Sequence, residues 1–167
     1  MRMTGLAALA AVAACAHAQR QVAREAELGE GNYRLVQIRS PTNIGGEERL
    51  VELGAQAVPV EDATGEAHQL AASGELDMLG AGRCRLQVRV SVDGEPSTAG
   101  EKACSWRVVG DELVLGGASG LDGGAHSVFR IAGAGSQIVL EGLYEESADG
   151  QRRDRRGLER IVMERRD

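Results

Sequence analysis

Apolar and polar residues alternate along much of the chain after residue 32, with the two-residue period of a β-strand. The clearest case is residues 84–92, where every even position is apolar and every odd position is polar. One face of this strand therefore faces a core and the other faces water. Shorter apolar runs separated by Gly, Asp, Ser and Pro predict further strands. The predicted strands are 33–39, 49–60, 66–71, 75–79, 83–92, 103–109, 112–116, 126–132, 136–144 and 157–165.

No helical pattern of useful length interrupts these strands, so helices cannot cover the apolar faces. The strands must bury those faces by closing on themselves or by packing on a second sheet. We predict an all-β fold, a small antiparallel up-and-down β-barrel of eight to ten strands, with a two-sheet sandwich as the alternative. The 167 residues suit a single domain, here a barrel over 32–167 that follows a flexible or short helical tail over 19–31.

The first 18 residues have the arrangement of a bacterial secretory signal peptide. One positive charge at Arg2 precedes a short run of small apolar residues, and Ala16-His17-Ala18 ends the segment with small side chains at a cleavage site. We therefore expect a signal peptide over 1–18 and a periplasmic or secreted protein. The alternative is an outer-membrane lipoprotein, because residues 12–15 resemble a lipobox in which Cys15 is lipidated.

Removal of this segment leaves two cysteines, Cys84 and Cys104, in an oxidising compartment, which favours a disulfide. The register of the strands offers two alternatives. A turn at residues 93–95 places Cys84 directly opposite Cys104, whereas a loop over 94–100 places Cys84 opposite residue 110. The first alternative extends a strand through Pro96, where no apolar alternation continues. We expect the disulfide, reconciled with the pattern by a bulge or by a bridge between strands that are not sequence neighbours.

Composition and charge exclude several classes of function. With 43% hydrophobic residues and a formal net charge of -6, the chain is neither a disordered polyelectrolyte nor a basic nucleic-acid binder. Its apolar runs are shorter than the roughly 20 residues of a membrane span. We expect a monomer that binds no nucleic acid and that touches a membrane only if Cys15 is lipidated.

Residues that carry chemistry are few. His68 and His126 have neither a cysteine nor a second histidine nearby in sequence, so we expect no metal site and no cofactor. Ser119 lacks the glycine that a nucleophile elbow places two residues later. The glycine-rich runs 80–83 and 133–136 enter strands rather than the helices that bind phosphate. We therefore expect no catalytic residues and a protein that is not an enzyme.

The stretch Gly31-Asn32-Tyr33 resembles the Gly-x-Trp opening of the lipocalin-like, or calycin, family of small barrels, with Tyr33 in the place of the tryptophan. In that family an arginine of the last strand packs across the ring, and the resemblance implies Arg160 for this role. Residues 106–115 also look like the middle hairpins of secreted bacterial lipocalin-like domains.

The resemblance implies a barrel that binds a small apolar or amphipathic molecule in its mouth. Residues expected to line or plug that mouth are Tyr33, Ile44, Val88, Val90, Trp106 and Phe129. Ile44 belongs to the loop over 40–48, which covers the open end in such barrels. The alternative partner is a secreted or envelope protein, since Cys84, Cys104 and Trp106 also resemble the periplasmic inhibitors of secreted metalloproteases. In that case strand edges or the tail form the interface.

The C-terminal segment over 151–167 holds seven arginines against four acidic residues. This basic segment has two interpretations. The arginines bind an anion or a lipid headgroup at one rim of the barrel, or they form a solvated hairpin whose charges prevent association between sheets. We favour the second interpretation.

Overall fold

The computed structural model describes residues 28–44, 46–117, 124–132 and 137–166. The predicted signal peptide over 1–18, the lipidation site Cys15 and tail residues 19–27 lie outside these ranges. Leu28, near the end of the predicted tail, is buried.

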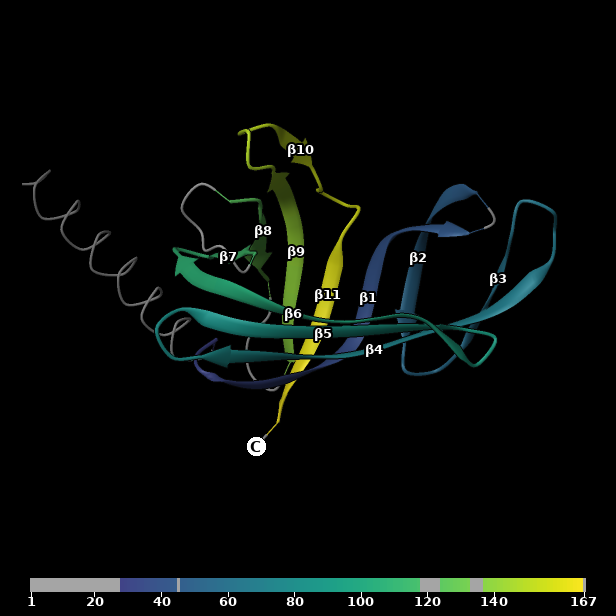
Figure 1. Cartoon of the computed structure of the whole chain (residues 1–167), viewed down its shortest axis with the longest axis horizontal. Coiled ribbons are helices and arrows are strands. Elements are labelled where there is room, and N and C mark those ends of the chain that lie inside the picture. The colour runs from purple at the N-terminus through teal and green to yellow at the C-terminus, as the bar shows by residue number, and fades with distance from the viewer. Residues whose placement is uncertain (1–27, 45, 118–123, 133–136, 167) are drawn as a thin grey trace, which may run out of the picture.

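The described residues form eleven β-strands in one sheet (Figure 1). The all-β prediction is confirmed. The strands are β1 Gly31–Ile44, β2 Glu47–Gly54, β3 Val58–Glu61, β4 Ala67–Leu79, β5 Arg83–Val92, β6 Glu95–Val109, β7 Glu112–Gly116, β8 His126–Ile131, β9 Gln137–Glu146, β10 Arg152–Asp154 and β11 Arg160–Arg166.

Eight of these strands close into an antiparallel barrel. Pairing runs from β1 through β11, β9, β8, β7, β6 and β5 to β4. The start of β1 then pairs with the end of β4, where Tyr33 lies opposite Leu76, and this pairing closes the ring. The predicted barrel is therefore confirmed, and β2, β3 and β10 are additions to it.

β1 and β4, which close the barrel, are paired only over four residues and separate beyond Arg34 of β1. Over residues 37–44, β1 exchanges β4 for β2 as its partner. Over residues 67–70, β4 pairs instead with β3. Together with the adjacent ends of β5 and β6, these segments form an extension on one side of the barrel (right of Figure 1).

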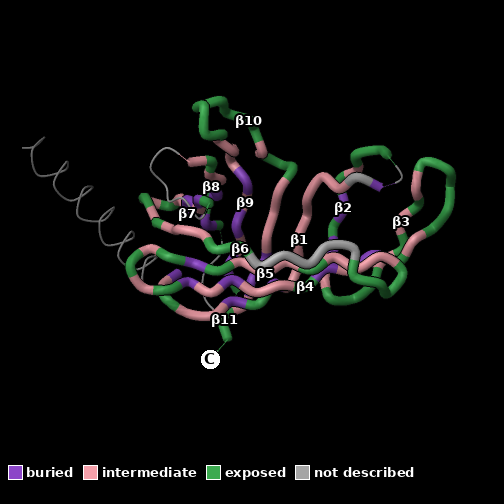
Figure 2. Tube along the Cα trace, viewed as in Figure 1, coloured by how far each residue is buried: buried purple, intermediate pink, exposed green. Residues whose placement is uncertain are grey.

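The hydrophobic core follows this division and has two clusters. The first fills the end of the barrel where β1 starts and includes Leu28, Tyr33 and Leu140. The second fills the extension and includes Ile44 and Leu70. Ile161 packs against both clusters. Figure 2 shows buried stretches on β8 and β9, within the barrel.

Several strand predictions need correction, among them the start of β6, predicted at residue 103, which lies at Glu95. The segments predicted as separate strands at 66–71 and 75–79 are continuous in β4, because Ser73 and Gly74 pair with β5. A Cβ atom on Gly74 would lie 2.5 Å from the carbonyl oxygen of Gln87, so only glycine allows this close approach. Conversely, the single strand predicted over 49–60 is two strands, since residues 55–57 turn between β2 and β3.

The turn between β5 and β6 determines the register of the disulfide. Asp93 and Gly94 have φ angles of 53° and 85°, as expected for a two-residue type I′ hairpin. Val90 pairs with Thr98 and Ser91 with Pro96, so one extra residue bulges out of β6. Below this bulge Cys84 lies opposite Cys104, with Cα atoms 4.7 Å apart, and the predicted disulfide is confirmed.

Tyr33 plugs one end of the barrel. Its side chain is fully buried, and its hydroxyl donates a hydrogen bond to the carbonyl oxygen of Gly29 at 2.8 Å. The arginine over its ring is Arg165, whose guanidinium carbon lies 6.0 Å from the ring centroid. The prediction that Arg160 takes this role is wrong, because Arg160 lies opposite Arg39, further along β1.

Loss of either cysteine of the disulfide should lower the free energy of unfolding by the same amount. The bridge closes a loop with a sequence separation of 20. Cys84→Ser and Cys104→Ser should each lower the free energy of unfolding by about 3 kcal/mol, because each frees the same loop in the unfolded chain. Urea denaturation measures this, and the double variant should lose no more than either single variant. Clearly additive losses would contradict the bond.

A double-mutant cycle tests the contact between Arg165 and Tyr33. Combining Tyr33→Leu with Arg165→Ala should give a coupling energy of roughly 0.5–1 kcal/mol in the free energy of unfolding, as expected for a cation–π pair. The matched cycle with Arg160→Ala should give a coupling energy near zero. Equal coupling in the two cycles would contradict this assignment.

Candidate functional site

A cavity of about 560 Å³ occupies the inside of the barrel. All eight barrel strands contribute to its wall, so it lies in the lumen and not in a surface groove. One wall residue from each strand, in chain order, is Leu35, Leu76, Leu86, Cys104, Leu115, Phe129, Leu140 and Met163. The wall is therefore mostly apolar.

The cavity lies between the two core clusters. Along β5, Leu86 packs against the first cluster and Val90 against the second, and Val88 between them lines the cavity. The opposite wall includes Ile161, which contacts both clusters. The space lies where the strands begin to diverge, and buried side chains of both clusters, such as Phe129 of the first and Leu35 of the second, line it.

Polar side chains mark the mouth of the cavity. Lys102, the only lysine of the chain, lies directly opposite Leu86 and therefore on the inner face of the sheet. It lines the cavity but is exposed, so it lies where the cavity meets solvent. His126 and Glu145 line the same end of the barrel, from the start of β8 and the end of β9.

Two of the six predicted ligand-binding residues, Val88 and Phe129, line this cavity. Tyr33 lies in the first core cluster, at the end of the barrel plugged by its ring. Ile44 belongs to the second cluster, in the extension, and Val90 packs against it. The prediction of a loop over 40–48 is wrong, because Ile44 is the last residue of β1 and β2 begins at Glu47. Trp106 packs against the first cluster, and its Nε1 atom donates a hydrogen bond to the carbonyl oxygen of Leu79 at 3.1 Å.

Sequence reasoning missed much of the wall. Leu86 shares the alternation that pointed to Val88, so the same signal could have found it. Leu35, Leu76 and Met163 come from strands far apart in the sequence, and only closure of the barrel brings them together. Lys102 lies in a segment without alternation, which gave no sign of a strand.

Three arginines of the hairpin near the C-terminus form ion pairs. Arg152 lies 2.5 Å from Glu146, Arg155 lies 2.6 Å from Glu145, and Arg156 lies 3.3 Å from Asp154. The hydrogen bond with Glu145 raises the pKa of the Arg155 guanidinium. These pairs agree with the interpretation of this segment as a solvated hairpin.

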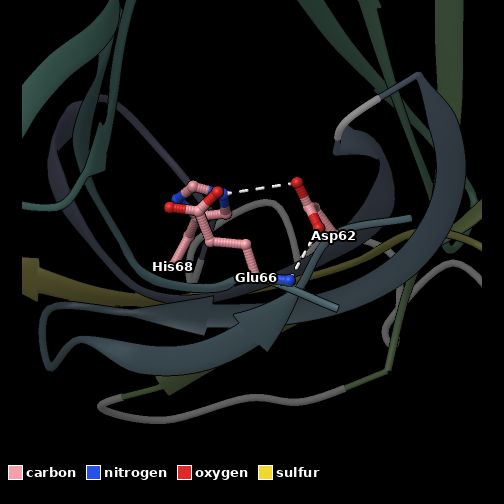
Figure 3. Close-up of side chains that lie close together, drawn as sticks. All are labelled: Asp62, Glu66 and His68. Atoms are coloured by element: carbon pink, nitrogen blue, oxygen red, sulfur yellow. Dashed lines mark hydrogen bonds and ion pairs between the residues drawn. The ribbon is translucent and has the colours of Figure 1, made fainter. Parts of the chain in front are cut away.

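A second group of polar side chains lies in the extension, at the turn between β3 and β4. Ligand atoms of Asp62, Glu66 and His68 lie within 4.8 Å of one another (Figure 3). His68 lies between two carboxylates. Its Nδ1 atom donates a hydrogen bond to Asp93 at 2.9 Å, and its Nε2 atom lies 3.7 Å from Asp62 Oδ2.

Local hydrogen bonds shift the pKa values in this group. Donation by the Thr64 hydroxyl, followed by the backbone N–H of Glu66, lowers the pKa of Asp62 to about 2. The hydrogen bond to Asp93 raises the pKa of His68. The pKa of Asp93 is lowered mainly by the backbone N–H of Gln69 and then by His68.

The sequence carries no clear sign of this group, because carboxylates are abundant along the chain and do not by themselves indicate a metal site. The usual sign, a cysteine or a second histidine near His68 in the sequence, is absent. The spacing Asp62-x3-Glu66-x-His68 is visible in the sequence, but Asp93 joins the group only through the β4–β5 pairing.

Comparison with known proteins found no matching family model, no matching curated protein and no matching solved structure. Among the described residues there is no helix long and apolar enough to cross a membrane.

The bond between His68 and Asp93 can be tested by titration. Asp93→Asn should lower the pKa of His68 towards the ordinary value of 6.5, as measured by NMR in the presence of a chelator. Because the folded-state pKa is raised, the bond stabilises the fold below pH 6.5 and is lost as pH rises through that pKa. The stability difference between the two proteins should therefore shrink at alkaline pH. A difference that stays constant from pH 6 to pH 9 would contradict the bond.

Proposed function

We propose that this protein is an exported, non-enzymatic β-barrel that binds a small apolar or amphipathic ligand inside the barrel. The observation that carries the proposal is the cavity of about 560 Å³. Small-molecule sites are typically concave and mostly apolar, with volumes of about 300–1,000 Å³. This cavity has that size and that kind of wall.

The side chains of the wall and of the mouth indicate which kind of ligand would fit. An aliphatic or aromatic body would replace water along the leucine, isoleucine and methionine side chains, which favours binding by the hydrophobic effect. A polar end of the ligand would lie near Lys102 and His126, where the cavity meets solvent. Gly117 also lines the cavity, and no atom of the described residues lies within 4 Å of where its Cβ would be.

Export is part of the proposal. The Cys84–Cys104 disulfide is compatible with a periplasmic or extracellular location. Residues 1–18 remain the predicted signal peptide, and Cys15 remains the alternative site for lipidation. In such an aqueous compartment, the cavity would remove the apolar surface of a ligand from water, which favours binding.

The alternative function is a protein-binding module that acts through a strand edge. β2 and β3 end the path of paired strands, so each pairs along one side only among the described strands. Leu50 on β2 is also half exposed. However, Glu47, Glu48 and Arg49 place charges on the same strand, as in edges that resist added strands. The cavity therefore supports ligand binding more strongly than these edges support protein binding.

Binding of a small neutral dye tests the proposal. N-phenyl-1-naphthylamine should bind with a rise in fluorescence, and Val88→Phe should weaken its binding by about tenfold because the added ring occupies the cavity. The matched control is Val109→Phe. Val109 is 52% exposed and lies outside the cavity wall, so this variant should bind the dye as the parent protein does.

Thermal melts of both variants check that the barrel stays folded. Absence of dye binding to the folded parent protein would contradict ligand binding and favour the edge-binding alternative. Equal affinity of Val88→Phe and Val109→Phe would place the dye outside the barrel.

A further inference from the structure

We propose that Asp62, Glu66 and His68 bind a divalent transition-metal ion of the zinc class at the turn between β3 and β4. The site is separate from the barrel cavity, because none of the three residues lines that cavity. The proposal is independent of the proposed function.

The distance between His68 and Asp62 fits a shared ion. Their Nε2 and Oδ2 atoms are 3.7 Å apart, an ion-pair distance when the ring is protonated and longer than a direct hydrogen bond. Two ligand atoms of a tetrahedral zinc ion, each bound at about 2.0–2.1 Å, are about 3.4 Å apart. The observed distance is therefore close to the span across a metal ion, and Glu66 lies within the same small volume.

Asp93 holds the imidazole in the orientation that a metal ligand needs. It comes from the turn between β5 and β6, and its Oδ2 atom accepts the Nδ1–H of His68 at 2.9 Å. Its Oδ1 atom accepts the backbone N–H of Gln69 at 2.8 Å, which fixes the carboxylate itself. Metal-binding histidines almost always donate their second ring N–H to such a group. With Nδ1 engaged in this way, Nε2 faces Asp62 (Figure 3), and in the neutral ring this atom offers its lone pair to a metal ion.

Asp62 is oriented in a comparable way. Its Oδ1 atom accepts hydrogen bonds from the backbone N–H groups of Thr64 and Glu66 and from the Thr64 hydroxyl, at 2.7–2.9 Å. These bonds leave Oδ2 towards His68, and only 12% of the Asp62 side chain is exposed. The carboxylate is thus held in place with one oxygen available.

The donor set favours zinc over calcium and magnesium. One neutral imidazole and two carboxylates supply a charge of -2 and a nitrogen ligand, which suits a borderline-soft ion. Calcium requires six to eight oxygen ligands, and magnesium requires octahedral oxygen coordination. Glu66 is exposed, so a water molecule or an external ligand can take the fourth position.

Bound metal would join the turns at the far end of the extension. The β3–β4 turn and the start of β4 supply the ligands, and Asp93 connects them to the β5–β6 turn. Arg49 of β2 donates hydrogen bonds to the carbonyl oxygens of Glu61 and Asp62 at 2.5 and 3.4 Å. The ion would therefore lie where three parts of the extension already meet.

Zinc titration of the full-length, oxidised protein without a histidine tag tests the site. Competition with a chromophoric chelator should detect one equivalent of Zn²⁺ bound with micromolar or tighter affinity, even in millimolar Mg²⁺. His68→Gln and Glu66→Gln should each weaken binding by at least about tenfold. The matched controls are His126→Gln and Glu61→Gln, which lie outside the cluster and should leave the affinity unchanged.

A second measurement separates coordination from nonspecific binding. On addition of Zn²⁺, the ¹⁵N resonance of His68 Nε2 should shift while Nδ1 keeps its proton, and Asp93→Asn should weaken zinc binding by about tenfold or more. Lack of binding at micromolar Zn²⁺ would overturn the proposal. So would zinc binding that survives His68→Gln, because the ion would then lie elsewhere.

Discussion

The pairing of four residues at the start of β1 with four at the end of β4 is the contact that makes this sheet a barrel. Gly31–Arg34 lie opposite Glu75–Met78, and this pairing joins the two ends of the path of eight strands. Without the seam, the first and last strands of the ring would both be edges, exposing their backbone groups. Tyr33 lies on the seam and is fully buried, so closure of the sheet and plugging of the barrel end depend on the same residue.

The shortness of this seam explains the cavity. Beyond Arg34 the two strands take different partners, β2 and β3, and the sheet opens into the extension. The side chains then gather into two clusters rather than one, and the lumen between them keeps a volume of about 560 Å³. Close packing normally removes such a space. Here the diverging backbone holds the walls apart.

The extension and the barrel provide two different chemical environments. The lumen is lined mostly by apolar side chains and has polar residues at its mouth, which suits an apolar or amphipathic molecule. The far end of the extension gathers charged side chains around His68, three of them carboxylates. A metal ion there would stabilise the turns at the end of strands that also bound the cavity, because β4 and β5 run through both regions.

Local alternation was enough to predict an all-β chain, most strand positions and the inward face of β5. It failed where a strand continues without alternation, as in residues 95–102 of β6, because pairing with β5 places those residues in the sheet. It also failed at Ser73 and Gly74, which read as a break but pair within β4.

By itself, the sequence determined the period of the strands and the presence of two cysteines after the first 18 residues. It left two alternatives for the turn between β5 and β6, and the pairing of these strands decides between them. The tertiary structure decided the partner of each strand, the arginine that covers Tyr33, the volume of the lumen and the grouping of Asp93 with His68. These features depend on pairings between residues far apart in the chain. Side-chain period specifies which face is buried, but it carries no information about which strand lies beside it.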